Sequence, residues 1–147
     1  MRHLRAVVTA CVCVALVGCA GPTVRDSAVR SQAEKSAGSM VSELRTAGLV
    51  AEVQIKDNAW WRYADVVVTD AEKAATTIEG TFTSSQPPSR EIEPLYRNTS
   101  TMLSDAADLV TDLRIAIRRH DTAEINRLRP QLAAAADDLE ILEASLQ

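Results

Sequence analysis

Apolar residues recur at intervals of three and four along most of the chain from residue 24 to the C-terminus. This spacing is typical of amphipathic helices, which bury one stripe of side chains. Four such stretches follow one another, with short turns between them. They predict an all-α protein, an up-down antiparallel four-helix bundle. We therefore assign residues 24–147 to one helical bundle domain.

The first stretch predicts a helix over 24–47. Its stripe is rich in alanine and contains Gly38, which favours close approach of a neighbouring helix. Gly48 follows, and glycine commonly ends helices because it accepts a positive φ. The next segment, 49–56, alternates apolar and polar residues as a strand does, but it has no evident strand to pair with. We interpret it as an extended connector or as the first turns of the second helix. The stripe consists of Val29, Ala33, Ala37, Met40 and Leu44.

The second helix is expected to start with Asp57 or Asn58 as its N-cap and to run to about Thr83. A linker at 84–89 follows, and its double proline, Pro87-Pro88, excludes continued helix. The expected seam of this helix is Trp61, Ala64, Val68, Ala71, Ala75, Ile78 and Phe82.

The third helix is expected to begin near Pro94, because proline is tolerated in the first turn. His120 takes the position after its end, and Asp121 with Glu124 forms a capping arrangement for the fourth helix. Pro130 falls on the outer face of that helix, so we expect a kink at solvent and not a second loop. The third stripe is Leu95, Tyr96, Thr99, Met102, Leu103, Ala106, Leu109, Val110, Leu113, Ala116 and Ile117. The fourth is Ile125, Leu128, Leu132, Ala135, Leu139, Leu142 and Leu146.

The N-terminus has the pattern of an export signal. Arg2 and Arg5 precede an apolar segment, 6–17, whose length suits a signal peptide and is too short to span a bilayer. The run Leu16-Val17-Gly18-Cys19 then resembles the lipobox of bacterial lipoproteins. That resemblance implies cleavage before Cys19 and a diacylglyceryl group on its thiol. It predicts a signal peptide at 1–18, a lipidated tether at 19–23 and a protein anchored on the extracytoplasmic face of the cell membrane.

A second resemblance concerns the rest of the chain. It rests on Pro87-Pro88 and on the run Asp112-Leu113-Arg114-Ile115-Ala116-Ile117-Arg118-Arg119-His120-Asp121. The run is similar to the Asp-Ala-Arg-Ile-Ala-Val-Arg-Arg-Gly-Asp-like turn of small, uncharacterised helical lipoproteins of high-GC Gram-positive bacteria. His120 stands where that pattern has glycine, and histidine is among the residues that tolerate a positive φ best. The resemblance implies no activity.

Charge and cysteine content narrow the possible partners and bonds. The formal net charge is −4, from 16 basic and 20 acidic residues, and cleavage removes two arginines. This acidity argues against nucleic acid and against adhesion to anionic lipids through a basic face. Cys11 and Cys13 lie in the signal and Cys19 is consumed by lipid, so no disulfide is expected. We expect a monomer that packing alone holds together.

The sequence offers no catalytic or metal-binding constellation. His120 is the sole histidine after processing, and we interpret it as a solvent-exposed residue at a helix end. Asp105, Asp108 and Asp112 are spaced to share a flank of the third helix, where carboxylates could ligate a hard cation. A solvated face is the more common reason for such a run. We expect no enzyme, no cofactor and no metal.

The run Trp60-Trp61-Arg62-Tyr63 is the candidate binding site, because the chain is only 3% aromatic. Neighbouring helical residues point about 100° apart, so we expect one indole in the core and the other at the bundle end or on a stacking surface. Two functions follow. One is a helical binding or scaffold module for another envelope protein. The alternative is a small-ligand carrier with a pocket beside this cluster.

The lipid anchor can be tested directly. Replacement of the attachment residue, Cys19→Ala, should release the protein from membranes or leave it unprocessed, because no other thiol remains in the processed chain. Mass spectrometry of the wild-type N-terminus should find it at Cys19 with a lipid mass. A wild-type chain that began at any other residue would contradict the prediction.

Overall fold

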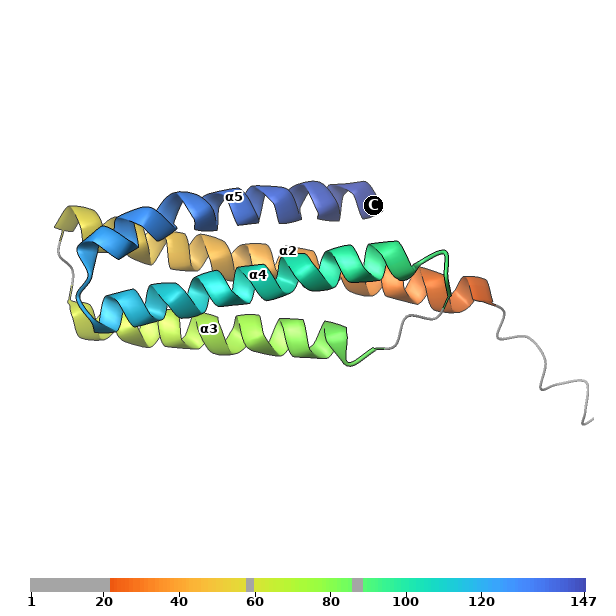
Figure 1. Ribbon diagram of the computed structural model, residues 1–147, viewed down its shortest axis with the longest axis horizontal. Helices are drawn as coiled ribbons and strands as arrows, with labels where there is room; N and C mark the ends of the chain where they lie inside the picture. The colour runs from red at the N-terminus through yellow and green to blue at the C-terminus, as the bar shows by residue number, and fades with distance from the viewer. Residues whose placement is uncertain (1–21, 58–59, 86–88) are drawn as a thin grey trace, which may run out of the picture.

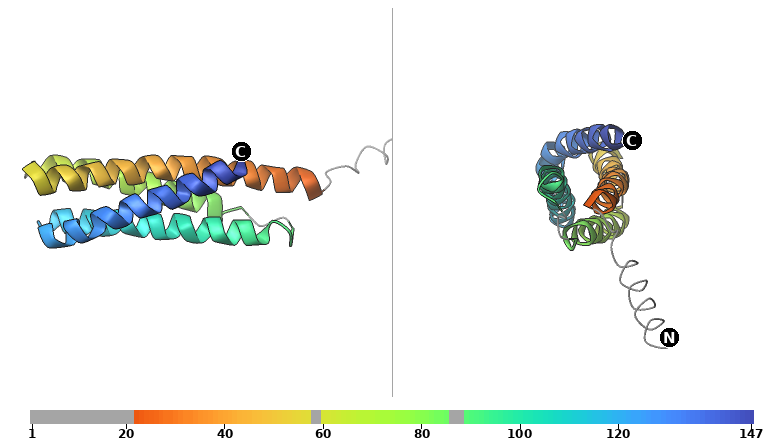
Figure 2. Two further views of the ribbon diagram at one scale, coloured as in Figure 1. Left: turned by 90° about the horizontal axis from the view of Figure 1, so that it is seen from above. Right: turned by 90° about the vertical axis from the view of Figure 1, so that its right-hand side faces the viewer.

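The computed structural model describes residues 22–57, 60–85 and 89–147, and these residues form four helices (Figure 1). Each helix runs antiparallel to the one before it. The end view in Figure 2 shows the helices at the corners of a square, in chain order around it, so that the last returns beside the first. The predicted all-α, up-down four-helix bundle is confirmed. The helices are α2 (Pro22–Asp57), α3 (Trp61–Thr83), α4 (Glu93–Arg118) and α5 (Thr122–Leu146).

The most extensive packing in the bundle joins α2 to α5. The buried stripe of α2 is mostly alanine and that of α5 is mostly leucine, so small side chains on one helix face large ones on the other. Gly38 adds to this fit: a Cβ built on it would lie 2.6 Å from Oε1 of Glu143 on α5. The close approach predicted at Gly38 is therefore confirmed. Alanine and glycine on α2 allow α5 to lie near its backbone.

The predicted end of the first helix at Gly48 is wrong. α2 continues through 49–56 to Asp57, so this segment is neither a connector nor the start of the second helix. Ala47 and Ala51 are fully buried on either side of the glycine, and Gly48 has no positive φ. Glycine within a helix costs about 1 kcal/mol. Burial of two further turns of α2 in the bundle offsets that cost.

The predicted N-cap of the second helix is also wrong. Asp57 is the last residue of α2, and Asn58 lies outside the described residues. Trp60 holds the N-cap position of α3 and makes no side-chain cap bond. The predicted seam and the end at Thr83 are confirmed. Five seam residues are buried, and Trp61 and Ile78 are partly buried against the core.

The start of the third helix is confirmed, since Pro94 lies in the first turn of α4. The double proline of the predicted linker, at 87–88, lies outside the described residues. Contacts between the end of α3 and the start of α4 hold the two helices together. The rings of Phe82 and Tyr96 stack at 5.2 Å, and the Tyr96 hydroxyl donates to the Thr83 carbonyl at 3.0 Å.

The turn between α4 and α5 also agrees with the sequence. His120 has φ 55°, and its N–H donates to the Ile117 carbonyl, while the N–H of Asp121 donates to the Ala116 carbonyl. These two bonds form a Schellman motif. The Asp121 carboxylate accepts from the N–H of Glu124 at 3.0 Å, as the predicted cap requires. Further on, α5 continues through the exposed Pro130 without a second loop.

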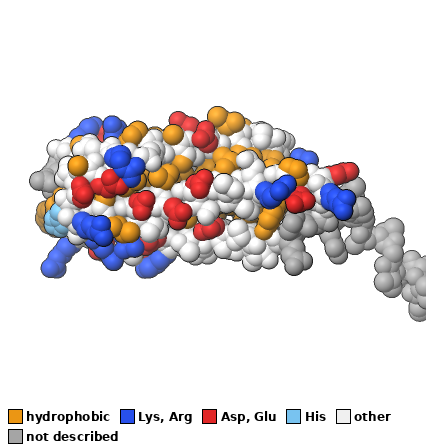
Figure 3. All heavy atoms as spheres, viewed as in Figure 1, with side chains coloured by type: hydrophobic (Ala, Val, Ile, Leu, Met, Phe, Trp, Pro, Cys, Tyr) orange, Lys and Arg blue, Asp and Glu red, His pale blue; other side chains and the backbone are white. Residues whose placement is uncertain are grey.

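Ion pairs join neighbouring helices. Arg114 of α4 lies 2.6 Å from Glu72 of α3 with both side chains largely buried, and Arg118 pairs with Asp65 at 2.7 Å. Arg45 of α2 bridges two carboxylates of α5, which hold its pKa above the ordinary value through hydrogen bonds, that to Glu140 first. Acidic and basic side chains accordingly lie side by side on the face drawn in Figure 3.

The packing of α5 yields a stability test with an internal control. Leu139 is 1% exposed and Ile141, two residues later, is 69% exposed. Leu139→Ala should lower the free energy of unfolding by about 2–5 kcal/mol, because it leaves a cavity in the core. Ile141→Ala should change it by no more than about 0.5 kcal/mol. Urea denaturation of both variants measures this, and similar losses for the two would refute the packing described.

Candidate functional site

The four residues of the predicted aromatic cluster lie where α2 ends and α3 begins, with their side chains in different surroundings. Trp60 is 85% exposed and Tyr63 is 68% exposed, while Arg62 also faces solvent. Trp61 is partly buried and packs against the core. The expected division of the two indoles is therefore confirmed: one contacts the core and the other is free at the bundle end.

Trp61 also contacts the turn between α4 and α5. Its ring stacks on that of His120, with centroids 4.2 Å apart and planes at 12°. The exposed helix-end position predicted for His120 is confirmed, but nothing in the sequence indicates the stack. Such a pair contributes about 0.5–1.5 kcal/mol beyond area burial. It holds the start of α3 against the turn between α4 and α5.

A group of exposed apolar side chains surrounds this end of α2 and α3. We call Leu49, Val53, Trp60, Tyr63 and Val66 the apolar face. Among the described residues, the exposed large apolar side chains number six, and five belong to this face. Single exposed apolar residues are ordinary on soluble proteins, whereas a concentration of them marks an interaction site. The apolar face therefore extends the predicted cluster onto the end of α2, a segment that the sequence predicted to be a connector or the first turns of the second helix.

The apolar face contains a hollow of about 280 Å³ between α2 and α3, which we call the end cavity. This volume is near the lower limit for ligand pockets. Tyr63 is the one residue of the predicted cluster that lines it. The full lining is Thr46, Leu49, Val50, Val53, Gln54, Tyr63, Ala64 and Val67.

Gln54 is the unusual member of this lining. Its side chain is 2% exposed, and within the described part of the chain neither the amide nitrogen nor the amide oxygen has a hydrogen-bond partner. Buried polar groups in proteins are nearly always paired. The sequence does not mark Gln54 as a site residue, because the alternating pattern of 49–56 places it on a polar, solvated side.

Charged residues border the apolar face on both helices. On α2, Lys56 donates to Glu52, and this hydrogen bond, followed by the charge of Lys56, lowers the pKa of Glu52 below its ordinary value. On α3, the exposed Arg62 adjoins Tyr63. Charges of both signs around an apolar centre are typical of protein interfaces, which have a polar rim.

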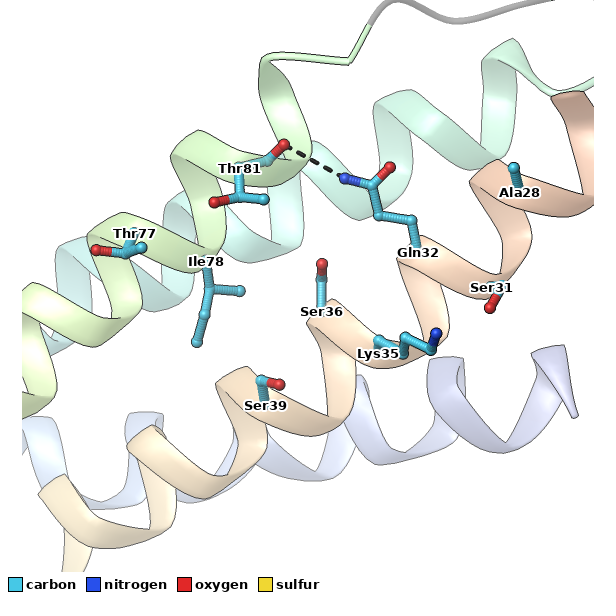
Figure 4. A pocket seen from close by; sticks show the side chains of 9 residues that line it. All are labelled: Ala28, Ser31, Gln32, Lys35, Ser36, Ser39, Thr77, Ile78 and Thr81. Atoms are coloured by element: carbon cyan, nitrogen blue, oxygen red, sulfur yellow. Dashed lines mark hydrogen bonds between the residues drawn. The ribbon is translucent and has the colours of Figure 1, made fainter.

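A second hollow, of about 550 Å³, lies between the same two helices nearer the start of α2, and we call it the hydroxyl groove (Figure 4). Its polar amide is already partnered: Gln32 Nε2 donates to the Thr81 carbonyl and Gln32 Oε1 accepts from the Ser85 hydroxyl, both at 3.3 Å. The groove therefore contains no counterpart of Gln54. The lining is Ala28, Ser31, Gln32, Lys35, Ser36, Ser39, Thr77, Ile78 and Thr81.

The remaining candidate residues form no site in the described part of the chain. Asp105, Asp108 and Asp112 are exposed along α4, and no three His, Cys, Asp or Glu side chains among the described residues are grouped as a metal ion would require. The described helices include none long and apolar enough to cross a membrane. Cys19, the predicted lipidation site, lies outside the described residues.

Comparison with protein-family models, with curated proteins and with solved structures gave no match. The apolar face and its end cavity are therefore the features from which a function is inferred.

The two tryptophans should differ sharply in their contribution to stability. Trp61→Ala removes the contact with the core and the stack on His120, and should lower the free energy of unfolding by about 2 kcal/mol or more. Trp60→Ala should change it by less than about 0.5 kcal/mol, because the side chain is exposed. Thermal and urea denaturation provide the measurement. Equal destabilisation by the two substitutions would mean that Trp60 is also a core residue.

Proposed function

We propose that this chain is a lipoprotein of the bacterial cell envelope that binds another envelope protein through its apolar face. The lipid on Cys19 anchors it to the extracytoplasmic side of the cell membrane, and the bundle acts as a binding or scaffold module without a catalytic step. One observation carries the proposal: five of the six exposed large apolar side chains among the described residues lie at one end of the bundle. Aromatic residues such as Trp60 and Tyr63 are the ones that dominate binding energy at protein interfaces.

The position of the apolar face supports a protein partner over the bilayer itself. The chain enters the bundle at the start of α2, and the apolar face lies at its other end (Figure 1). α2 has 36 residues, which span about 54 Å at 1.5 Å per residue. An anchor at Cys19 therefore attaches at the opposite end from the apolar face. That separation suits presentation to another protein.

The end cavity favours a second candidate function, that of a small-ligand carrier. Its volume of about 280 Å³ and its largely apolar lining are suited to a compact ligand. Against this, Trp60, Trp61 and Arg62 are not part of the lining, and neither is Val66, so two residues of the apolar face lie outside the cavity. A protein partner makes use of all five residues, so the binding module is the better-supported function.

Crosslinking and affinity capture from native membranes tests the binding module. The double substitution Trp60→Ala with Tyr63→Ala should reduce the captured partner by at least about tenfold, since truncated interface hot spots cost about 2 kcal/mol or more each. Ile141→Ala is the matched control, because it removes an exposed apolar side chain from α5 and should leave capture unchanged.

Both variants must keep the wild-type melting temperature for this comparison to concern binding alone. Capture that survives the double substitution, or that falls equally in the Ile141→Ala control, would refute the role of the apolar face.

A further inference from the structure

Gln54 is a buried polar residue in mostly apolar surroundings. The side chain sits among apolar neighbours at the junction of α2 and α3, nearly free of contact with solvent, and both of its amide atoms lack partners within the described residues. An amide that loses its hydrogen bonds to water and gains none in return destabilises the folded chain. Leucine or methionine would fill the same space without that loss. Gln54 therefore lowers the stability of the free protein. A role in binding would compensate for that loss.

The surroundings of Gln54 suggest what would compensate. Gln54 is part of the lining of the end cavity, which opens within the apolar face. Its amide offers one oxygen acceptor and two N–H donors, so the group that satisfies it best presents a donor and an acceptor side by side. A second primary amide, as on an asparagine or glutamine side chain, has this arrangement. The glutamine side chain has three rotatable bonds, so its amide can turn toward the cavity without a change in the backbone.

We propose that the end cavity receives an apolar segment of the partner protein that carries a primary amide, and that Gln54 pairs with this amide through both of its polar atoms. The proposal rests on the proposed function, because it names the chemistry by which the apolar face recognises its partner. Val50, Val53 and Val67 surround the apolar part of the inserted group, and the exposed ring of Tyr63 lies at the same cavity.

This arrangement gives the apolar face its selectivity. An apolar surface alone distinguishes poorly between partners, whereas a buried group that must be paired rejects a ligand that leaves it unpaired. A partner that brings only hydrocarbon into the cavity leaves the Gln54 amide unsatisfied. A partner that brings a primary amide satisfies the hydrogen-bonding groups of both amides. Gln54 thus acts as a specificity residue and not as a stabilising one.

The first experiment tests whether the Gln54 amide is unpaired in the free protein. In the full-length lipidated protein in detergent micelles, Gln54→Leu should raise the melting temperature by about 3–6 °C, because an apolar side chain of similar size replaces an unpaired amide. Gln32→Leu is the matched control on the same helix: its amide is hydrogen-bonded, so that variant should melt at or below the wild-type temperature. A lower melting temperature for Gln54→Leu would overturn the proposal.

The second experiment tests amide recognition with two probes of the same shape. Cyclohexanecarboxamide and cyclohexyl methyl ketone differ in that the ketone has a methyl group where the amide has NH₂. Titration of the ¹⁵N-labelled protein should shift the side-chain NH₂ signals of Gln54, with the amide binding about tenfold more tightly than the ketone. Gln54→Leu should abolish this preference. Equal binding of the two probes to the wild-type protein, or no binding of either, would overturn the proposal.

Competition identifies the source of the amide. Cyclohexanecarboxamide should reduce crosslinked capture of the partner, and Gln54→Leu should reduce it at least about tenfold while the ketone has little effect. If the amide probe binds at Gln54 without affecting capture, the amide comes from a free ligand and the partner-segment proposal is wrong. If capture depends on Trp60 and Tyr63 but not on Gln54, the binding module stands and the amide recognition fails.

Discussion

The whole arrangement depends on the continuity of α2. This helix packs against both of its neighbours, and its stripe of alanine allows α5 to approach its backbone, as it does at Gly38. Gly48 is the weakest position, because glycine gains no side-chain contacts and loses more conformational freedom than any other residue. The buried alanines on either side of it, Ala47 and Ala51, hold the helix together there. If α2 ended at Gly48, Leu49, Val53 and Gln54 would not lie beside α3.

Sequence periodicity predicted the elements that local patterns determine. The capped turn at His120 and Asp121, the entry at Pro94 and the seam of α3 all depend on residues within a few positions of one another. The seam of α5 was predicted except at one position, where Ala136 is buried and the predicted Ala135 is only partly so. The end of α2 was predicted wrongly because the signals that favour a break are local. The interaction that decides the outcome is packing against residues far away in the chain. Gly48 and the alternating pattern of 49–56 favoured a break, whereas burial against the other helices favours continuation.

The candidate site was predicted in part, for a similar reason. The exposure of Trp60 and Tyr63 and the contact of Trp61 with the core follow from helical geometry at the start of α3. The stack of Trp61 on His120 joins segments far apart in the chain, so no local pattern reveals it. Gln54 illustrates the same limit, since its burial results from α3 packing beside the end of α2. Both features appear only when the helices are assembled.

Hydrogen exchange measured amide by amide is the most direct test of whether α2 is continuous through Gly48. With α2 continuous, amides from residue 49 to 56 should exchange at least about 100-fold more slowly than those of an unfolded chain, and the amides around Ala37 should be protected as well. Exchange of residues 49–56 at unfolded-chain rates, with protection ending at Gly48, would contradict it. The apolar face would then lose its α2 half, and Gln54 would no longer be held at the end cavity.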